Sequence, residues 1–242
     1  DGDGGRDAAR QAEAIDPGPT ASAGYSAALE LDLEGHADAE TIADAAVAAY
    51  AAGAFRHAAT LAEQAIERLA GGRAERLLTS RASPEARERA ALLSEQLGRY
   101  RRSSGDTIGS RAAIEQALEL SGSAPTATRA RILASLAQTQ MLADYEGHYE
   151  DSAVRAEEAR TAARSAGEDG LADLAHATDT LAVDLAFGRG EIDRALGLLD
   201  EAIDDARRAG RLDELMRCYA NKTTLLDLDS RREEALAVVK EG

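Results

Sequence analysis

The sequence is poor in the residues that build disulfide-stabilised or aromatic-rich domains. Its 242 residues include no tryptophan, aromatic residues make up 3%, and cysteine occurs once, at Cys218. A single cysteine excludes an internal disulfide framework and a cysteine-based zinc site, and it is compatible with a reducing compartment. With only four prolines, long helices are not interrupted. No run of 18 apolar residues and no signal peptide is found, so we expect a cytoplasmic protein that does not enter a membrane.

The sequence also contains fewer basic than acidic residues. The 28 lysines and arginines face 44 acidic residues, which gives a net charge of -16. Such a surface repels phosphate groups, and this argues against direct nucleic-acid binding by this segment.

Catalytic and ligand-binding motifs are absent as well. The phosphate-binding motif G-x-x-x-x-G-K-[ST] does not occur, nor do H-E-x-x-H, C-x-x-C or G-x-S-x-G. Asp173, His176 and Asp179 share one helical face and could ligate a metal, but a solvated polar face is the favoured interpretation. We therefore expect no enzyme, no cofactor and no metal.

The chain is rich in alanine, leucine, acidic residues and arginine, spaced as in amphipathic helices, which indicates an all-α fold. Pro84 and Pro125 are predicted to begin helices, because the first helical position needs no N–H donor. Residues 72–82 are predicted to form a short helix or a loop. The predicted helices cover residues 38–52, 54–70, 84–103, 107–121, 125–143, 148–166, 169–187, 190–209, 211–228 and 231–241.

Two regions follow from these patterns. Residues 1–37 are polar and contain glycine and proline, which predicts a flexible lead-in with one or two short helices. Residues 38–242 are predicted to form one repeat domain.

Small residues recur at fixed distances in this repeat domain. A turn residue is followed by a small residue five positions later and by another seven positions after that. Four copies occur: Gly53, Ala58 and Ala65; Gly105, Ser110 and Ala117; Gly147, Ser152 and Ala159; Gly190, Ala195 and Ala202. A partial copy, Ser230 and Ala235, follows.

The turn residues are separated by 52, 42, 43 and 40 residues. The first small residue would let the two helices of a pair approach closely, and the second would contact the next pair. This pattern predicts a tetratricopeptide-like, right-handed superhelix, an α-solenoid of about four to five antiparallel helix pairs with the last truncated. HEAT-like pairs share the period and are the structural alternative.

Four stretches of the repeat domain are ALLSEQLGRYRRSSGD (91–106), RARILASLAQTQMLADYEGHYEDSAVRAEEARTAARSAGE (129–168), GRGEIDRALGLLDEAIDDARRAG (188–210) and CYANKTTLLDLDSRREEALAVVKEG (218–242). These stretches resemble the helical-repeat region of large LuxR-type, MalT-like transcriptional regulators. The resemblance implies a sensor region that binds an effector or a protein partner and signals to ATPase and DNA-binding domains lying elsewhere in such regulators. The alternative function is a freestanding scaffold that binds a partner's peptide.

A binding groove can be predicted from the repeat. In a tetratricopeptide array the first helix of each pair lines the concave face, so equivalent positions can be counted back from each turn residue. Positions three, six and ten before the turn predict a groove formed by Glu95, Arg99, Arg102, Met141, Thr180, Asp184, Phe187 and Asp227. A peptide or small-molecule effector is the expected ligand, and a solvent-lined concavity is the alternative. The truncated last repeat would expose an apolar end that a homodimer would cover.

Overall fold

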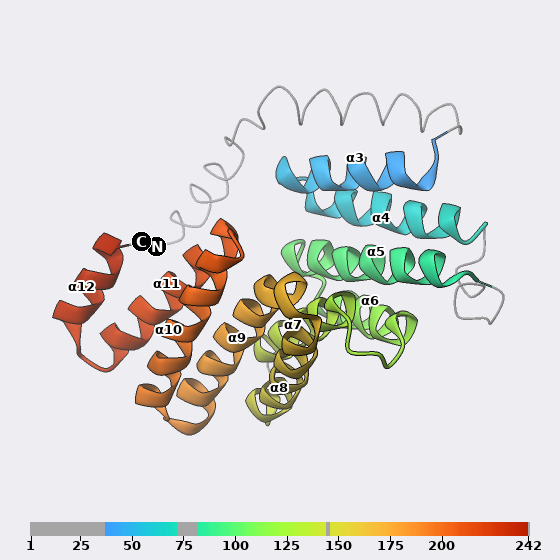
Figure 1. Ribbon diagram of the computed structural model, residues 1–242. Coiled ribbons are helices and arrows are strands. Elements are labelled where there is room, and N and C mark those ends of the chain that lie inside the picture. Colours follow the sequence, from blue (N-terminus) through green and yellow to red (C-terminus); the bar gives the residue numbers. More distant parts are fainter. Residues whose placement is uncertain (1–36, 72–81, 144–145, 242) are drawn as a thin grey trace, which may run out of the picture. The chain divides into compact units, whose positions relative to one another are not determined.

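A computed structural model describes residues 37–71, 82–143 and 146–241 of the chain (Figure 1). Within these ranges the secondary structure is helical and contains no strand, which confirms the predicted all-α class. The lead-in predicted over residues 1–37 and the segment predicted over 72–82 lie outside the described residues, apart from their last positions.

The first compact unit lies within residues 1–120 and the second within residues 121–242. In the first unit, antiparallel helices follow one another as α3 (Ala39–Ala51), α4 (Phe55–Leu69), α5 (Pro84–Ser103) and α6 (Thr107–Ser121). The second unit contains α7 (Ala127–Met141), α8 (His148–Ala166), the 3-10 helix η3 (Gly167–Gly170), α9 (Leu171–Arg189), α10 (Ile192–Arg208), α11 (Leu212–Leu228) and α12 (Arg232–Glu241).

The helix starts follow from local chemistry. Ser83 precedes α5, and its hydroxyl accepts a hydrogen bond from the backbone N–H of Ala86 at 3.2 Å, while Pro84 occupies the first turn. Thr126 caps α7 in the same way through the N–H of Arg129, also at 3.2 Å. These caps satisfy backbone donors that have no partner within the helix.

The turn inside each helix pair contains a residue in the left-handed region. Gly53, Gly105, Gly147 and Gly190 have φ angles of 76°, 86°, 82° and 70°. The last turn has Ser230 at φ 61°, although a residue with a Cβ rarely adopts this conformation. The spacing of turn residues in the sequence therefore coincides with the places where the backbone reverses.

The small residues that follow each turn are enclosed. Ala58, Ala65, Ser110, Ala117, Ser152, Ala159, Ala195 and Ala202 all have 0% exposure. A larger side chain at such a site would separate the packed helices, because protein interiors are close-packed.

In the second unit, the first helices of successive pairs also contact each other, α7 with α9 and α9 with α11. The core between α10, α11 and α12 is aliphatic and includes Leu199, Cys218, Leu225 and Val238. The pairs are therefore stacked, and each pair provides a face on which the next one packs.

Candidate functional site

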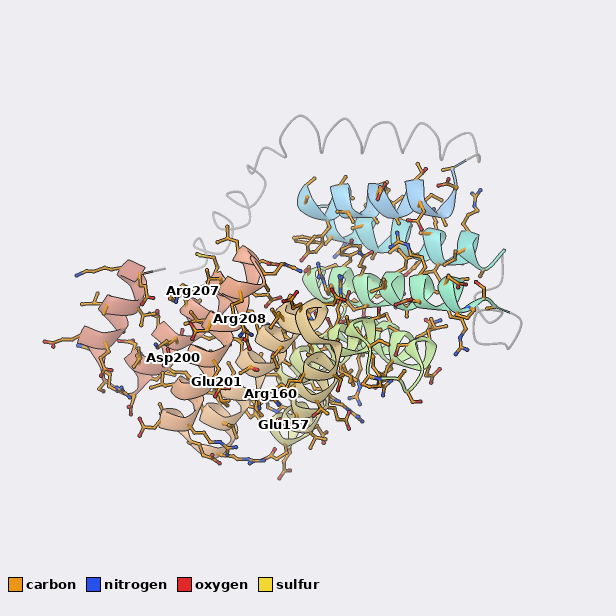
Figure 2. All side chains as sticks on the ribbon, in the orientation of Figure 1. Glu157, Arg160, Asp200, Glu201, Arg207 and Arg208 are labelled. Carbon is orange, nitrogen blue, oxygen red and sulfur yellow. The ribbon has the colours of Figure 1, made fainter. Side chains whose placement is uncertain are left out.

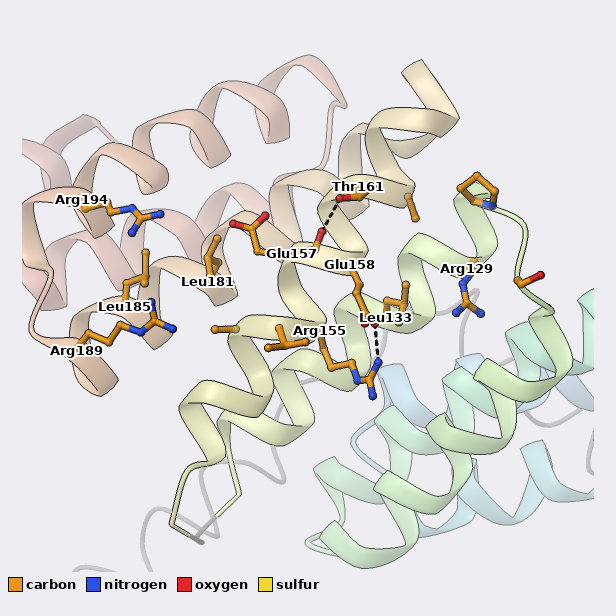
Figure 3. Close-up of a pocket in the computed structure, with 15 residues that line it drawn as sticks. Arg129, Leu133, Arg155, Glu157, Glu158, Thr161, Leu181, Leu185, Arg189 and Arg194 are labelled. Atoms are coloured by element: carbon orange, nitrogen blue, oxygen red, sulfur yellow. Dashed lines mark hydrogen bonds and ion pairs between the residues drawn. The ribbon is translucent and has the colours of Figure 1, made fainter.

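A groove on the second unit is the main candidate site (Figure 3). It has a volume of about 660 Å³ and is lined by α7, α8, α9 and α10, with Ser123 and Pro125 at one end. The name "α8 groove" is used below for this site, because α8 contributes the most residues to it. All of its lining residues belong to the second unit.

The floor of the α8 groove is apolar. Leu133 of α7 and Leu181 and Leu185 of α9 line it and are almost fully buried in the core beneath. Val154 of α8 also lines the groove, but its side chain is 59% exposed. An exposed β-branched residue next to a continuous aliphatic floor offers a surface on which an apolar side chain of a ligand can be buried.

Arginines surround this floor. Arg129, Arg155, Arg189 and Arg194 line the α8 groove together with two carboxylates, Glu157 and Glu158. The groove lining is therefore positively charged in a chain whose net charge is -16.

The four arginines are paired to different degrees. Arg155 donates to the Glu158 carboxylate at 2.6 Å. Arg194 lies 2.9 Å from Glu191, and Arg189 lies 4.0 Å from the same carboxylate. Arg129 donates to the Gly122 carbonyl and the Ser121 hydroxyl, and it forms no ion pair with the part of the chain that the structure describes. Of the four groove arginines, Arg129 is thus the one best able to donate hydrogen bonds to a carboxylate of a ligand.

Arg160 of α8 contacts side chains of three helices; Figure 2 labels it together with Glu157 and Glu201. Its guanidinium is almost buried and donates to Thr178 of α9 at 3.1 Å and to Glu157 of α8 at 3.1 Å. It also lies 3.5 Å from Glu201 of α10. These contacts hold the helices that carry the groove in a fixed register.

A buried carboxyl lies next to the groove floor. Asp184 of α9 is 2% exposed, and its Oδ2 atom is 2.7 Å from the hydroxyl of Ser152. Burial raises the pKa of Asp184 to about 7, and the hydrogen bond from Ser152 opposes this shift. Asp184 is therefore protonated more readily than an ordinary aspartate.

The groove residues predicted from the sequence occupy several environments. Glu95, Thr180 and Asp184 are buried at 2% exposure or less, so they do not contact solvent. Phe187 is 49% exposed and stacks on Tyr149 with ring centroids 6.3 Å apart. Among the others, Arg99 lies 3.9 Å from Glu95 on α5, and Asp227 lies 3.9 Å from Arg232.

Glu95, Arg99 and Arg102 belong to the first unit, whereas Met141, Thr180, Asp184, Phe187 and Asp227 belong to the second. None of the eight lines the α8 groove. The groove predicted from the sequence stays a prediction.

The groove predicted from the sequence does not include the α8 groove residues, because that prediction used positions on the first helix of each pair alone. α8 is a second helix, and it contributes more of the lining residues than any other helix. One signal was available in the sequence. Val154 is an exposed aliphatic β-branched residue on a helix whose buried side chains are mostly alanines.

Two of the three polar residues considered as metal ligands, His176 and Asp179, contact α11 instead. Asp179 accepts two hydrogen bonds from the Asn221 amide, at 2.9 and 3.0 Å, and His176 Nδ1 lies 3.7 Å from a Glu214 oxygen. Among the described residues, no cluster of three or more potential ligands is arranged to hold a metal ion. None of the described helices combines the length and hydrophobicity needed to cross a bilayer.

Comparison with known proteins bears on the fold. No protein-family model and no curated protein matches the chain. The crystal structure of BtubC (BKLC) from P. vanneervenii is similar, with a TM-score of 0.63 and 20% sequence identity over 92% of this chain and 86% of that one. The fold is a tetratricopeptide-like helical repeat.

A putative kinesin light chain from Podosopora anserina with nearly identical tetratricopeptide-like repeats gives a TM-score of 0.49 at 13% identity, covering 91% of each chain. The regulator context implied by the sequence resemblance gains no support from these comparisons and stays a hypothesis.

Proposed function

We propose that this chain is a non-enzymatic protein-interaction module that binds a peptide segment of a partner protein in the α8 groove. The observation that carries the proposal is the combination of an aliphatic floor with a rim of arginines in a site of about 660 Å³. Helical-repeat proteins offer extended surfaces of this kind for binding other chains.

The groove chemistry favours a particular kind of segment. Val154 and the leucines of the floor would bury an aliphatic anchor, since apolar contact supplies most of the binding free energy. Arg129 and Arg194 on the rim would pair with carboxylates of the segment. Because the rest of the surface is acidic, such a segment would be repelled elsewhere and attracted here.

A narrower hypothesis concerns the protein in which this module acts. The resemblance to LuxR-type regulators suggests a sensor region that passes partner or effector binding to an ATPase domain and a DNA-binding domain. The sequences that flank this chain in the full-length protein test that hypothesis. A phosphate loop upstream and a helix-turn-helix downstream would support it, and their absence would favour a scaffold.

The groove proposal can be tested by peptide display. A library of random peptides is selected on the purified chain, and the enriched peptides are measured by fluorescence anisotropy against two variants. Val154→Asp introduces a charge next to the groove floor, whereas Val47→Asp changes a valine of α3 that is 48% exposed and lies outside the groove.

We expect Val154→Asp to weaken binding by roughly tenfold or more, because a buried ligand side chain would face an unpaired carboxylate. Val47→Asp should leave the affinity unchanged. Peptides that bind all three proteins equally would show that the α8 groove is not the binding site, and a library without enriched peptides would refute the interaction function itself.

A further inference from the structure

A chain of short polar contacts joins three of the four helices that line the α8 groove. The hydroxyl of Ser152 on α8 lies 2.7 Å from Asp184 Oδ2 on α9 and 2.9 Å from the carbonyl oxygen of Ala137 on α7. All three residues are buried, with exposures of 2% or less. The chain therefore connects α7, α8 and α9 in a place that water does not reach.

The residues next to this chain line the groove. Ala153 follows Ser152 on α8, and Leu185 follows Asp184 on α9. Arg189, five residues after Asp184, also lines the groove on the side of α9 (Figure 3). A change in the distance between α8 and α9 at Ser152 would therefore move side chains of both the floor and the rim.

The protonation of Asp184 decides whether both contacts of the chain are hydrogen bonds. When the carboxyl is ionised, Asp184 Oδ2 and the carbonyl oxygen of Ala137 are both acceptors, and Ser152 has one hydrogen to share between them. A protonated Asp184 donates to Ser152, which then donates to Ala137. Asp184 Oδ1 has no hydrogen-bond partner among the residues that the structure describes, so a negative charge there is poorly compensated. The protonated form is thus the one that ties the three helices together.

Few charged groups act on the Asp184 carboxyl. Burial raises its pKa to about 7, the hydrogen bond from Ser152 and the charge of Arg189 lower the pKa, and Glu150 of α8 raises it. Residues 133–141 of α7, around Ala137, contain no charged residue. Towards the same end of the neighbouring helices lie Asp151 of α8, Asp193 and Arg194 of α10, and Lys222 and Asp227 of α11. Those on α10 and α11 form ion pairs with other residues.

We propose that the α8 groove binds its peptide together with a proton on Asp184, so that the affinity falls as the pH rises through neutrality. This inference rests on the function proposed above for the groove. The tied helices hold the aliphatic floor in place for the ligand. A ligand carboxylate that pairs with Arg189 also weakens the attraction between Arg189 and an ionised Asp184, which favours the protonated form. By linkage, the proton then favours the ligand to the same extent.

The direction and the limit of the effect follow from a pKa of about 7 for Asp184 in the free chain. Below this pKa the carboxyl is already protonated, and binding takes up no proton. Above it, the competent form is a fraction of the molecules, and the apparent dissociation constant rises as that fraction falls. Between about pH 6 and about pH 8.5 the rise should be about fivefold or more, with a limit of about thirtyfold if the protonated form alone binds.

Fluorescence anisotropy over this pH range tests the proposal. The probes are peptides enriched on the purified chain in the selection described above, chosen without histidine and labelled with a dye that is insensitive to pH in this range. Asp184→Asn keeps a donor towards Ser152 at every pH, so its affinity should stay high and change by less than about twofold. Asp227→Asn is the matched control, because the Asp227 side chain is 68% exposed, and it should show the same pH dependence as the original chain.

A second measurement needs no ligand. Val154→Cys provides an exposed thiol in the groove for a polarity-sensitive dye, whereas Cys218 is fully buried and does not compete for the label. Because ionisation of Asp184 loosens the groove walls, the emission of the dye should change with a midpoint near pH 7. The emission should stay constant with pH when Asp184→Asn is added.

The results separate this inference from the groove function itself. A peptide affinity that does not change with pH, or that changes equally in Asp184→Asn, would overturn the proton coupling. If Val154→Asp still weakens that binding, the groove function stands. A selection without enriched peptides would refute the interaction function and the coupling with it, and a dye emission that is constant with pH would show that Asp184 does not control the groove walls.

Discussion

Replacing Asp184 by asparagine should stabilise the protein at neutral pH, and the gain should depend on pH. The hydroxyl of Ser152 lies 2.7 Å from Asp184 Oδ2 and 2.9 Å from the carbonyl oxygen of Ala137. Its single hydrogen cannot serve both oxygens fully. A protonated Asp184 carboxyl can instead donate to the Ser152 hydroxyl, which is then free to donate to the carbonyl oxygen of Ala137. The side-chain amide of an asparagine can donate to Ser152 in the same way.

The size of this pH-dependent change in stability follows from the pKa of Asp184. Burial raises the pKa of Asp184 from 3.8 to about 7, with a small further increase from Glu150 and an opposing effect of Arg189. Between these two values the folded state keeps a proton that the unfolded state has released. The free energy of unfolding therefore falls as pH rises through this window, by at most about 4 kcal/mol in total. Above the pKa of Asp184 in the folded state, this group no longer makes the free energy of unfolding change with pH.

Urea unfolding followed by circular dichroism measures this effect. The difference in unfolding free energy between Asp184→Asn and the original chain should grow by about 2 kcal/mol between about pH 5 and pH 7, and then level off. The matched control is Asp227→Asn, because the Asp227 side chain is 68% exposed. A difference that stays constant with pH would refute the idea that Asp184 is held protonated.

Four backbone positions give further predictions, each measured by urea unfolding. Ser230→Gly should stabilise the chain by about 0.5–1 kcal/mol, because Ser230 has a φ of 61°, and Gly190→Ser at φ 70° should destabilise it by about 1 kcal/mol. If Ser230→Gly and Gly190→Ser changed the free energy of unfolding in the same direction, this reasoning would be refuted. Gly98→Ala should cost about 1–3 kcal/mol, because its Cβ would lie 2.3 Å from Ile114 Cγ1. Gly197→Ala should stabilise the chain by about 0.5–1 kcal/mol, because a Cβ there would meet no described atom within 4 Å beyond its chain neighbours and its own helix backbone, and a loss of stability would contradict the reasoning.

Much of the fold could be predicted because it depends on local rules. The helix predicted over residues 84–103 matches α5 (Pro84–Ser103), since Ser83 and Pro84 mark its start. The turn at Gly190 could be predicted because few other residues adopt its φ without strain. Small residues such as Ala195 and Ala202 recur because close helix packing leaves no room for larger ones.

The candidate site was not predictable in the same way. Thr180 and Asp184 occupy predicted groove positions but are buried, because neighbouring helices pack over them, and a count along one helix contains no information about those neighbours. Arg129 and Arg194 are 65 residues apart in the sequence and line one groove, because α7, α8, α9 and α10 pack together.

By itself the sequence determined the helices, their turns and their repeated pairing, because capping, glycine conformation and apolar periodicity act within a few residues. Only the tertiary structure decided which surfaces remain open. The α8 groove exists because side chains from several helices line it and no further helix covers it among the described residues, and that depends on contacts between distant segments. Exposure is a property of the packed molecule, so the binding surfaces become visible only once the helices are assembled.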